Sequence, residues 1–250
     1  MKLLDSLKAK SCSLNGECKK CCLICRLLAN ILISAIVAII VNKCMGGNDV
    51  KKVIKDNPKL IIESVDNFYK KEQEDRNKDM QKKAPEVAKK LESMNPVLGN
   101  KDGSKVIVEF FDYACGHCKR EAMELHKVIE KHPNVKVVLA DLAIMSQHSH
   151  VAAATGIYVY LQNPNKLEQY YMLMSKSEVN AESIKKVLKS IGLPENYSEK
   201  AMKDERVKEI LENNFEMART IGLQGTPALI INGKMVPGAI SFNDIDAMLK

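Results

Sequence analysis

The sequence predicts an α/β domain preceded by helical N-terminal segments, and three observations support this prediction. Residues 27–41 form an apolar run without a charged residue, and residues 57–93 have a charged pattern with helical spacing. Residues 105–112 have the composition of a buried strand and lead into a Cys-x-x-Cys motif followed by a helical pattern. The 250 residues are 46% hydrophobic and 28% charged, which excludes a wholly disordered, collagenous or multi-span membrane protein.

The formal net charge of +7 is concentrated towards the N-terminus. Residues 1–47 hold seven lysines and arginines against two acidic residues, and residues 48–96 hold twelve against ten. Residues 97–250 hold nineteen against nineteen, so the predicted domain is neutral as a whole. A phosphate-binding surface needs a basic stripe on the folded domain, and we therefore expect no nucleic-acid partner.

Residues 1–26 form a basic tail that contains cysteines. Four of these cysteines follow the spacing i, i+3, i+4, i+7, which places them on one face of a helix. They are Cys18, Cys21, Cys22 and Cys25. A metal site or a lipidated patch is one interpretation, but structural zinc sites separate their ligand pairs by a spacer that is missing here. We favour reduced thiols in a cytoplasmic tail, and the sequence assigns no role to these cysteines or to Cys12 and Cys44.

The apolar run predicts a membrane anchor over residues 27–43. As a helix with a rise of ~1.5 Å per residue, the run covers about 23 Å, somewhat less than the ~30 Å core of a bilayer. A secretory signal peptide is the competing interpretation, but no A-x-A cleavage site follows, and Lys43 does not suit a lipoprotein site before Cys44. We favour an uncleaved signal anchor with the N-terminus inside, over a cleaved signal and over a buried soluble helix.

Residues 48–96 are expected to form a helical linker or an oligomerisation segment. Asn57 suits an N-cap, and Pro58 suits the first helical position. An apolar stripe at helical spacing is formed by Ile61, Val65 and Phe68. Residues 70–83 then carry ten charges in fourteen positions, so this stretch cannot bury itself. A solvated helix is favoured, a stalk that packs against copies of itself is the alternative, and Pro85 is expected to kink or end the helix.

A strand, a Cys-x-x-Cys motif and a helix follow one another between residues 105 and 131. The free backbone N–H groups and the positive end of the dipole at a helix N-terminus stabilise a thiolate. We therefore predict that Cys115 is the exposed, attacking nucleophile. Cys118 lies one turn further on and is expected to resolve the mixed disulfide that such an exchange forms. His117 is expected to favour the thiolate by hydrogen bonding or, when charged, by electrostatic attraction.

Glu109 lies inside the apolar strand, six residues before Cys115. Burial of a carboxylate is unfavourable, so this position needs an explanation. One interpretation is that Glu109 accepts or delivers the proton of the resolving cysteine. The other is that a strand end or a bulge lets the carboxylate reach water, and the sequence leaves both open.

A single Cys-x-x-Cys motif is also half of a zinc site, so a second feature is needed to decide its chemistry. The predicted domain has no second cysteine pair, and its histidines outside the motif show no ligand spacing with it. We therefore expect no metal and no organic cofactor. The deciding feature is residues 225–238, which read as a strand, an Asn-Gly hairpin turn and a strand, with Pro227 where the first strand starts.

The motif and this distant segment resemble those of the DsbA-type thioredoxin-fold thiol:disulfide oxidoreductases. In that family the Thr-Pro peptide bond is cis, and its loop packs beside the reactive disulfide. The resemblance implies that Thr226 and Pro227 flank Cys115 and form the client-binding platform. Glu109 matches the buried acid of the family at the same spacing from the motif.

The resemblance covers residues 97–250 and implies a thioredoxin-like α/β fold with an inserted helical domain. Residues 144–222 match the helical insertion that distinguishes this type from thioredoxin itself. The segments before residue 97, the anchor helix and the charged helix, go beyond the minimal family domain. A final helix is expected to begin with Ser241 as its N-cap and Asp244 three residues further on.

The resemblance also implies an enzyme that forms disulfide bonds in exported proteins and is served by a membrane redox partner. The cytosol would hold its dithiol reduced, so the domain is expected in the periplasm, tethered to the bacterial inner membrane or released by cleavage. Some relatives with a helical N-terminal extension are trimers that shuffle wrong disulfides. A homotrimeric isomerase or reductase assembled through residues 57–93 is therefore the alternative. Two alternatives of another class are a client-binding holdase without redox activity and a metal chaperone that uses Cys115 and Cys118.

Overall fold

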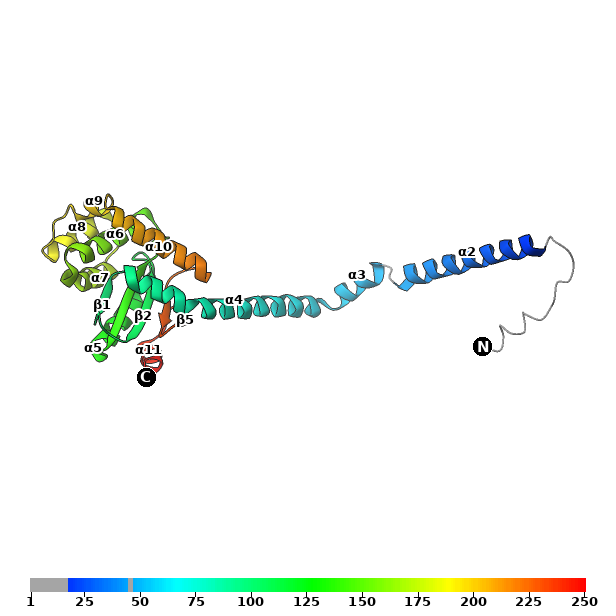
Figure 1. Ribbon diagram of the computed structural model, residues 1–250, viewed down its shortest axis with the longest axis horizontal. Coiled ribbons are helices and arrows are strands. Elements are labelled where there is room, and N and C mark those ends of the chain that lie inside the picture. The colour runs from blue at the N-terminus through cyan, green and yellow to red at the C-terminus, as the bar shows by residue number, and fades with distance from the viewer. Residues whose placement is uncertain (1–17, 45–46) are drawn as a thin grey trace. The chain divides into compact units, whose positions relative to one another are not determined.

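The computed structural model describes residues 18–44 and 47–250 (Figure 1). Residues 1–17 of the predicted tail, with Cys12, lie outside this range. The described side chains begin at residue 27, so those of the other tail cysteines, and that of Cys44, are also outside it. The chain divides into two compact units, Met1–Lys70 and Lys71–Lys250.

The first unit contains α2 (Cys18–Cys44), α3 (Gly47–Asp56) and the first turns of α4 (Pro58–Met94). Pro58 opens α4, as the sequence predicts. The apolar side chains of α2 between residues 27 and 40 are exposed. Within the part of the chain that the structure describes, no helix has both the length and the apolar composition needed to cross a membrane.

The second unit is built on a mixed sheet, whose strands in the described residues follow the order β1-β3-β2-β4-β5. The strands are β1 (Val97–Gly99), β2 (Lys105–Phe111), β3 (Val135–Asp141), β4 (Ala228–Ile231) and β5 (Lys234–Pro237). β2 and β3 run parallel, whereas the other neighbouring pairs are antiparallel. β2 is the central strand, with Glu109 opposite Leu139 on one side and Leu229 on the other.

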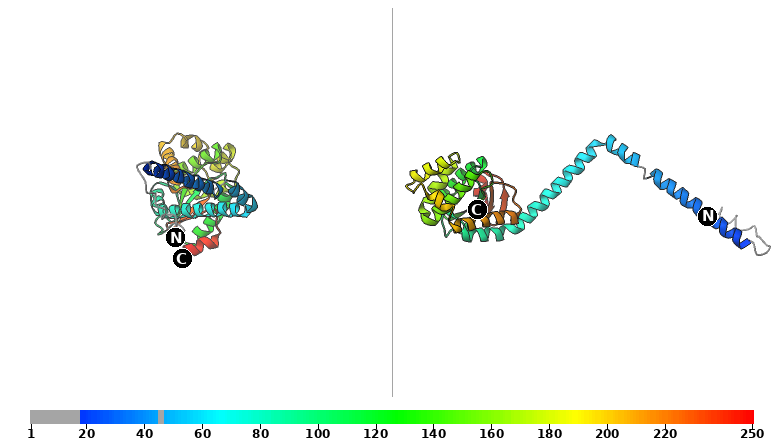
Figure 2. Two further views of the ribbon diagram at one scale, coloured as in Figure 1. Left: turned by 90° about the vertical axis from the view of Figure 1, so that its right-hand side faces the viewer. Right: turned by 90° about the horizontal axis from the view of Figure 1, so that it is seen from above.

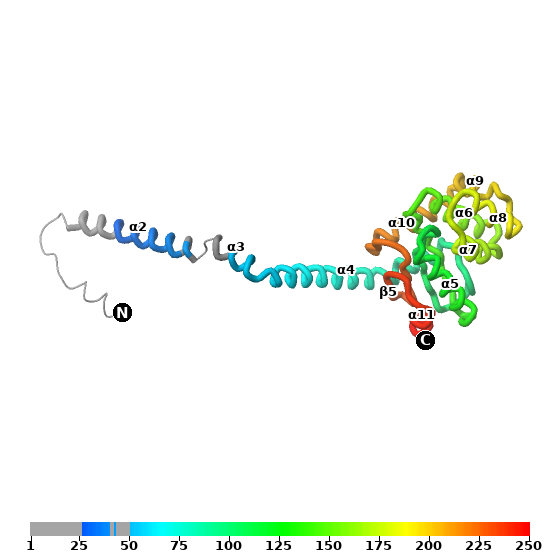
Figure 3. Tube along the Cα trace, turned by 180° about the vertical axis from the view of Figure 1, so that it is seen from behind, coloured from blue at the N-terminus to red at the C-terminus, as the bar shows by residue number. Residues whose placement is uncertain are grey.

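Helices cover both faces of the sheet, which explains why β2 is almost uniformly apolar. Ile107 and Phe111 pack on one face with α5 (Gly116–Lys131) and α11 (Phe242–Met248). Val108 and Phe110 pack on the other face with α4 and α10 (Glu205–Ile221). Figure 1 shows the second unit from the side of α4 and α10, and Figure 3 shows it from the side of α5.

The C-terminal half of α4 is part of the second unit. Ala84, Val87 and Leu91 are buried in the core. The Gln81 side chain covers the edge of β5: its Nε2 donates to the Met235 carbonyl oxygen at 2.6 Å, and its Oε1 accepts from the Met235 N–H at 3.0 Å. Since an open strand edge invites pairing with other chains, this contact also protects the sheet.

One expectation about this segment is corrected by the structure. Pro85 does not end the helix, because α4 continues through Pro85 to Met94. Packing of the turns on both sides of the proline outweighs the lost backbone hydrogen bond. The compact unit begins at Lys71, because this half of α4 contributes to its core.

A block of helices is inserted between β3 and β4, where the sequence places it. In chain order it consists of α6 (Gln147–Gln162), the 3-10 helix η1 (Pro164–Lys166), α7 (Leu167–Ser175), α8 (Ala181–Ser190), α9 (Tyr197–Ala201) and α10. Ser146, Asn180 and Asp204 cap α6, α8 and α10 by accepting backbone N–H groups. Figure 2 shows α6 to α9 gathered at one side of the second unit, whereas α10 packs on a face of the sheet together with α4.

The two local motifs of the C-terminal region are confirmed. Asn232 and Gly233 connect β4 to β5 with φ angles of 48° and 80°, the geometry that a tight two-residue hairpin requires. The Ser241 side chain accepts from the Asp244 N–H, and the Asp244 carboxylate accepts from the Ser241 N–H. This capping box starts α11.

Candidate active site

The Cys-x-x-Cys motif lies where the chain passes from β2 into α5. Cys115 is the N-cap residue of α5, with an extended backbone at φ −76° and ψ 118°. Cys118 lies in the first turn, and Gly116 and His117 between the two cysteines are exposed. Both sulfurs are free thiols. Cys115 keeps 6% of its surface exposed and Cys118 keeps 2%, so both residues are buried and the expectation of an exposed Cys115 is wrong. The loop that carries Thr226 covers the Cys115 sulfur, which is still the less buried of the two.

Asp112 fixes the backbone that leads into the motif. Its Oδ1 accepts the N–H of Ala114 at 2.7 Å. Its Oδ2 accepts the N–H groups of Ile144 and Met145, both at 2.8 Å, and the Ser149 hydroxyl at 3.1 Å. The buried carboxylate therefore ties the segment after β2 to the segment after β3. The sequence analysis did not identify Asp112 as a residue that fixes this backbone. Its position, directly after a buried strand and before a reactive motif, is a signal that could have identified it.

The Cys115 thiol has a pKa below its ordinary value. Burial raises this pKa, but hydrogen bonds to the sulfur outweigh the effect of burial. They come from the backbone N–H and the thiol of Cys118, from Thr226 and from the backbone N–H of His117. The start of α5 therefore supplies the donors that stabilise a thiolate at Cys115.

The Cys118 thiol has a pKa well above its ordinary value. Burial is the main cause, and hydrogen bonds involving Thr226 and the backbone of Asp112 oppose it only in part. The neighbouring Cys115 thiol and the charge of Glu109 raise the pKa further. The site therefore favours a thiolate at Cys115 and a protonated thiol at Cys118.

The loop before β4 brings Thr226 to the motif from 111 residues further along the chain. The Cys115 thiol donates to the Thr226 carbonyl oxygen, and the sulfur and oxygen are 3.5 Å apart. The peptide bond between Thr226 and Pro227 is cis. Pro227 is buried, and its carbonyl oxygen accepts the N–H of Gly238 at 3.0 Å. The structure thus brings Cys115, Cys118 and the Thr226 segment together.

Glu109 is fully buried on β2. Its Oε2 accepts the Tyr171 hydroxyl of α7 at 2.7 Å, and its Oε1 has no hydrogen-bond partner among the described residues. Burial raises the pKa of Glu109 to about 8; the Tyr171 hydrogen bond lowers it, and the charge of Glu121 raises it. Because β2 pairs without interruption around Glu109, the interpretation in which a bulge or strand end lets this carboxylate reach water is wrong.

Glu121 is a second buried carboxyl group, which the sequence did not reveal. It follows Cys118 by three residues and so lies on the same face of α5. It is 1% exposed, and its Oε2 accepts the N–H of Ile240 at 3.0 Å. Burial raises the pKa of Glu121 to about 7; the Ile240 N–H lowers it, and the charge of Glu124 raises it. The i+3 spacing from a reactive cysteine is the signal that could have found it.

The His117 side chain faces Arg120 instead of acting on Cys115. Its Nδ1 is 2.7 Å from a guanidinium nitrogen of Arg120. A guanidinium only donates hydrogen bonds, so Nδ1 is the acceptor in this contact. The backbone N–H of His117 lowers the pKa of Cys115.

Within residues 18–44 and 47–250, no three or more His, Cys, Asp and Glu side chains are grouped so that they could hold a metal ion.

Comparison with known proteins defines the family. The sequence matches the DSBA-like thioredoxin domain family over residues 106–250, which is more than half of the chain. The chain belongs to this family. DsbA-like proteins are thiol:disulfide oxidoreductases, so the enzyme class implied by the resemblance is confirmed. The thioredoxin-like α/β fold with a helical insertion is confirmed as well.

Individual DsbA-like relatives are distant. Disulfide bond formation protein D of Bacillus subtilis is 22% identical over 163 residues, which are 60% of this chain and 73% of the relative. The thiol-disulfide exchange protein alpha-DsbA2 of Wolbachia pipientis has a TM-score of 0.64 and 26% identity, over 70% of this chain and 96% of its own. Proteus mirabilis ScsC in a transitional conformation has a TM-score of 0.61 and 26% identity, over 83% of this chain and 93% of its own. The likeness to ScsC therefore extends beyond the part that matches the family.

Proposed function

We propose that this chain forms disulfide bonds in exported proteins through a redox-active disulfide between Cys115 and Cys118. One observation carries the proposal: the Cys115 thiol, of lowered pKa, lies beside the more deeply buried Cys118 thiol, of raised pKa, at a helix N-terminus. A thiol of low pKa is a good leaving group, which favours release of Cys115 from a mixed disulfide. A thiol of high pKa is protonated once it is released, which favours the dithiol form at Cys118.

The exchange proceeds in two steps. A client thiolate attacks the Cys115 sulfur, a bond forms between the client and Cys115, and the electron pair of the broken disulfide leaves on Cys118, which takes up a proton. A second client thiolate then attacks the client sulfur of the mixed disulfide, and Cys115 leaves as a thiolate. The client has been oxidised by two electrons, and the enzyme has been reduced to its dithiol.

We assign the proton taken up by Cys118 to Glu109. With a pKa raised to about 8, Glu109 is mostly protonated at neutral pH and can donate. The charge of Glu109 raises the pKa of Cys118, so loss of the Glu109 proton and uptake by Cys118 favour one another. Thr226 and Pro227 are proposed to form the client-binding platform, because the Thr226 carbonyl already lies against the reactive sulfur.

We place the domain in the periplasm and propose residues 27–43 as its anchor in the inner membrane. Periplasmic conditions would keep the disulfide available, whereas cytosolic thiols would reduce it, and a membrane redox partner would reoxidise the dithiol. The exposed apolar side chains of α2 support the anchor. Carbonate extraction of membranes that contain the full chain tests the anchor. We expect the chain to stay with the membranes in carbonate and to dissolve in detergent. Release by carbonate would contradict the anchor.

A homotrimeric disulfide isomerase is the second candidate, and two observations favour it. The likeness to ScsC covers 83% of this chain, so it includes residues N-terminal to the family domain. In the first unit, apolar side chains between Val53 and Tyr69 line a groove of about 410 Å³ that further copies of the chain would cover. In this function the reduced Cys115 first attacks an incorrect client disulfide and forms a mixed disulfide. Another client thiolate then attacks the client sulfur of that bond, which forms a new client disulfide and releases Cys115 as a thiolate.

Refolding assays separate the two candidates. An oxidase restores activity to a reduced test protein but not to its scrambled form, whereas an isomerase restores the scrambled form as well. Cys115→Ser is expected to abolish both activities, since no other described cysteine lies beside Cys118. Dithiol-dependent activity retained by Cys115→Ser would contradict the proposed site.

A further inference from the structure

A cleft of about 450 Å³ lies between α4 and the loop that carries Thr226 and Pro227. Residues 222–228 of the loop, together with Pro237 and Gly238, form one wall. The other wall is α4, through Gln73, Arg76, Asn77 and Met80. All of these residues belong to the second unit, and the α4 wall lies outside the residues that match the family.

The α4 wall is one face of the helix. Gln73, Arg76, Asn77 and Met80 are spaced i, i+3, i+4, i+7, so their side chains lie on one side. The same face continues into the docked half of α4, where Ala84 is buried in the core. Along this face the side chains change from apolar, where the sheet covers them, to amides and a guanidinium, where the loop leaves a cleft.

This face of α4 already binds an extended backbone elsewhere in the fold. The Gln81 amide donates to the carbonyl and accepts from the N–H of Met235 on the outer edge of β5. Asn77 and Gln73 present the same chemical group one and two turns before Gln81. Because a side-chain amide has both a donor and an acceptor, it can pair with any residue of an extended chain, whatever its side chain.

We propose that Gln73, Arg76 and Asn77 of α4 form a second wall of the client site and bind the extended backbone of an unfolded client polypeptide. The inference rests on the proposed function. Thr226 connects the cleft to the reactive thiol, since it lines the cleft and its carbonyl oxygen lies 3.5 Å from the Cys115 sulfur. A client joined to Cys115 has its neighbouring residues at the mouth of this cleft. Arg76 is paired with Glu72 at 3.3 Å, so the wall selects for an extended backbone rather than for client charge.

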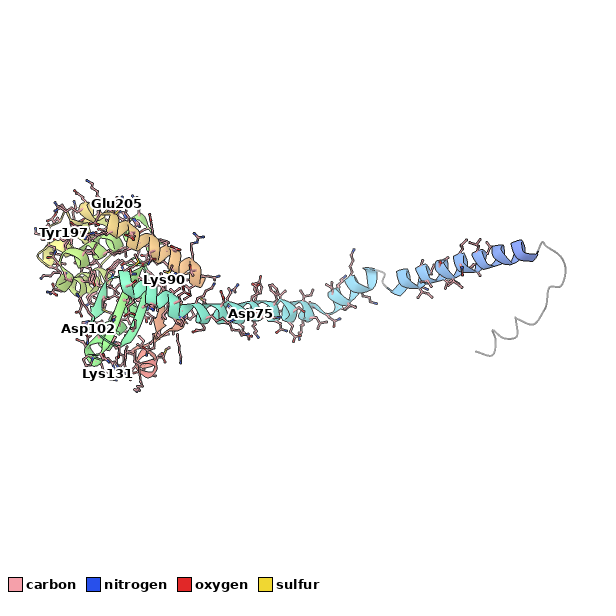
Figure 4. The ribbon with its side chains drawn as sticks, in the orientation of Figure 1. Asp75, Lys90, Asp102, Lys131, Tyr197 and Glu205 are labelled. Carbon is pink, nitrogen blue, oxygen red and sulfur yellow. The ribbon has the colours of Figure 1, made fainter. Side chains whose placement is uncertain are left out.

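Photo-crosslinking in the trapped complex tests the α4 wall. The full chain with Cys118→Ala is coupled at Cys115 to an unfolded peptide with one cysteine, and a benzophenone amino acid replaces Asn77. The control places the same group at Asp75, which Figure 4 labels on α4 and which lies about 200° around the helix from Asn77. We expect crosslinks to the peptide from position 77 and not from position 75.

Crosslinks that are absent at position 77, or equal at both positions, would overturn the inference while the mixed disulfide itself still forms. Failure of the mixed disulfide to form would instead overturn the proposed function, and this inference with it. A kinetic test needs no crosslinker. The double variant Gln73→Ala, Asn77→Ala is expected to oxidise the peptide roughly fivefold to tenfold more slowly, from the loss of two hydrogen bonds. Asp75→Ala is the matched control and should leave the peptide rate unchanged. Equal peptide rates in the double variant and the wild type would refute the α4 wall.

Discussion

The Cys115 thiol lies 3.5 Å from the carbonyl oxygen of Thr226, although 111 residues separate the two in the chain. The contact joins the helix N-terminus that activates the sulfur to the loop before β4. On the proposed function, a client that forms a bond with Cys115 approaches over Thr226. The contact places the loop before β4 directly against the sulfur at one end of the sheet.

The thiolate at Cys115 is predicted to persist below the ordinary thiol pKa of 9.0. In Cys118→Ser, iodoacetamide should therefore alkylate Cys115 with an inflection below pH 9. Cys118→Ala removes the side-chain donor that serine keeps, so its inflection should lie at higher pH than that of Cys118→Ser. Rates of alkylation followed by mass spectrometry from pH 4 to pH 10 check both points. An inflection at or above pH 9 in the serine variant would count against the activated thiol.

Glu109 is predicted to reduce the stability of the reduced protein as the pH rises. Its pKa is about 8 in the folded protein and 4.5 ordinarily, so the folded state holds the extra proton between these values. Stability due to this group is full below pH 4.5 and is lost as the pH rises to 8. Glu109→Gln keeps an acceptor for Tyr171 without the charge, and should raise the unfolding free energy at pH 9 by up to about 5 kcal/mol. Urea unfolding at pH 5 and pH 9 measures this difference, and an equal gain at both values would exclude titration of Glu109 as its cause.

The same Glu109→Gln variant is predicted to slow client oxidation at pH 7, because glutamine cannot deliver a proton to Cys118. Loss of a general acid typically lowers a rate by about 100-fold or more, and water can replace part of that contribution, so we expect a decrease on the order of tenfold to 100-fold. Stopped-flow measurement of mixed-disulfide formation gives the rate of the relevant step, because Cys118 takes up its proton when the client attacks the disulfide. A wild-type rate and pH profile in the variant would remove Glu109 from the mechanism.

Asp112 is predicted to be a major determinant of stability near the motif. In Asp112→Asn one oxygen becomes an NH₂ group, which cannot accept the N–H donors now bound by the carboxylate. The expected loss is about 2–3 kcal/mol, since buried hydrogen bonds to a charged group are broken. Denaturant unfolding of this variant should be compared with Asp102→Asn, an exposed aspartate that should change stability little. Equal stability of the two variants would show that the Asp112 contacts contribute little.

The exposed apolar side chains of the first unit are predicted to mediate self-association. Val65 and Phe68 lie on one stripe of α4 and line the groove described above. Phe68→Asp places a charge on this stripe and should shift the full chain in detergent from trimer to monomer. Light scattering gives the mass of both proteins. A wild-type monomer that oxidises clients but does not shuffle disulfides would eliminate the isomerase alternative.

Local sequence chemistry predicts much of the fold. The apolar run of β2, the Asn232-Gly233 turn and the Ser241 cap each depend on residues that are neighbours in the chain, and all three form as expected. The course of α4 could not be predicted in this way. Pro85 interrupts helices in isolation, and only the packing of the helix on the sheet keeps it continuous.

The sequence alone predicts those parts of the candidate site whose residues are close together in the chain. The parts that depend on distant segments could be expected only from the family resemblance. Cys115 and Cys118 follow from the strand, motif and helix order, but the contact with Thr226 is a tertiary contact that spacing alone does not indicate. Glu109 was visible as a charge in an apolar run, yet its complete burial depends on both neighbouring strands and on Tyr171. Glu121 is one of several charged residues on α5, so its burial is not visible from composition, and only its i+3 spacing from Cys118 indicates it.

The most direct test of the central claim is the identity of the sulfur that binds the client. Reduced protein carrying Cys118→Ala or Cys115→Ala is mixed with a single-cysteine peptide whose thiol is activated as a mixed disulfide, and the adducts are mapped by mass spectrometry. The account predicts a rapid, stable peptide adduct on Cys115 in Cys118→Ala and little adduct on Cys118 in Cys115→Ala. A faster adduct on Cys118 than on Cys115, or none on either residue, would contradict it.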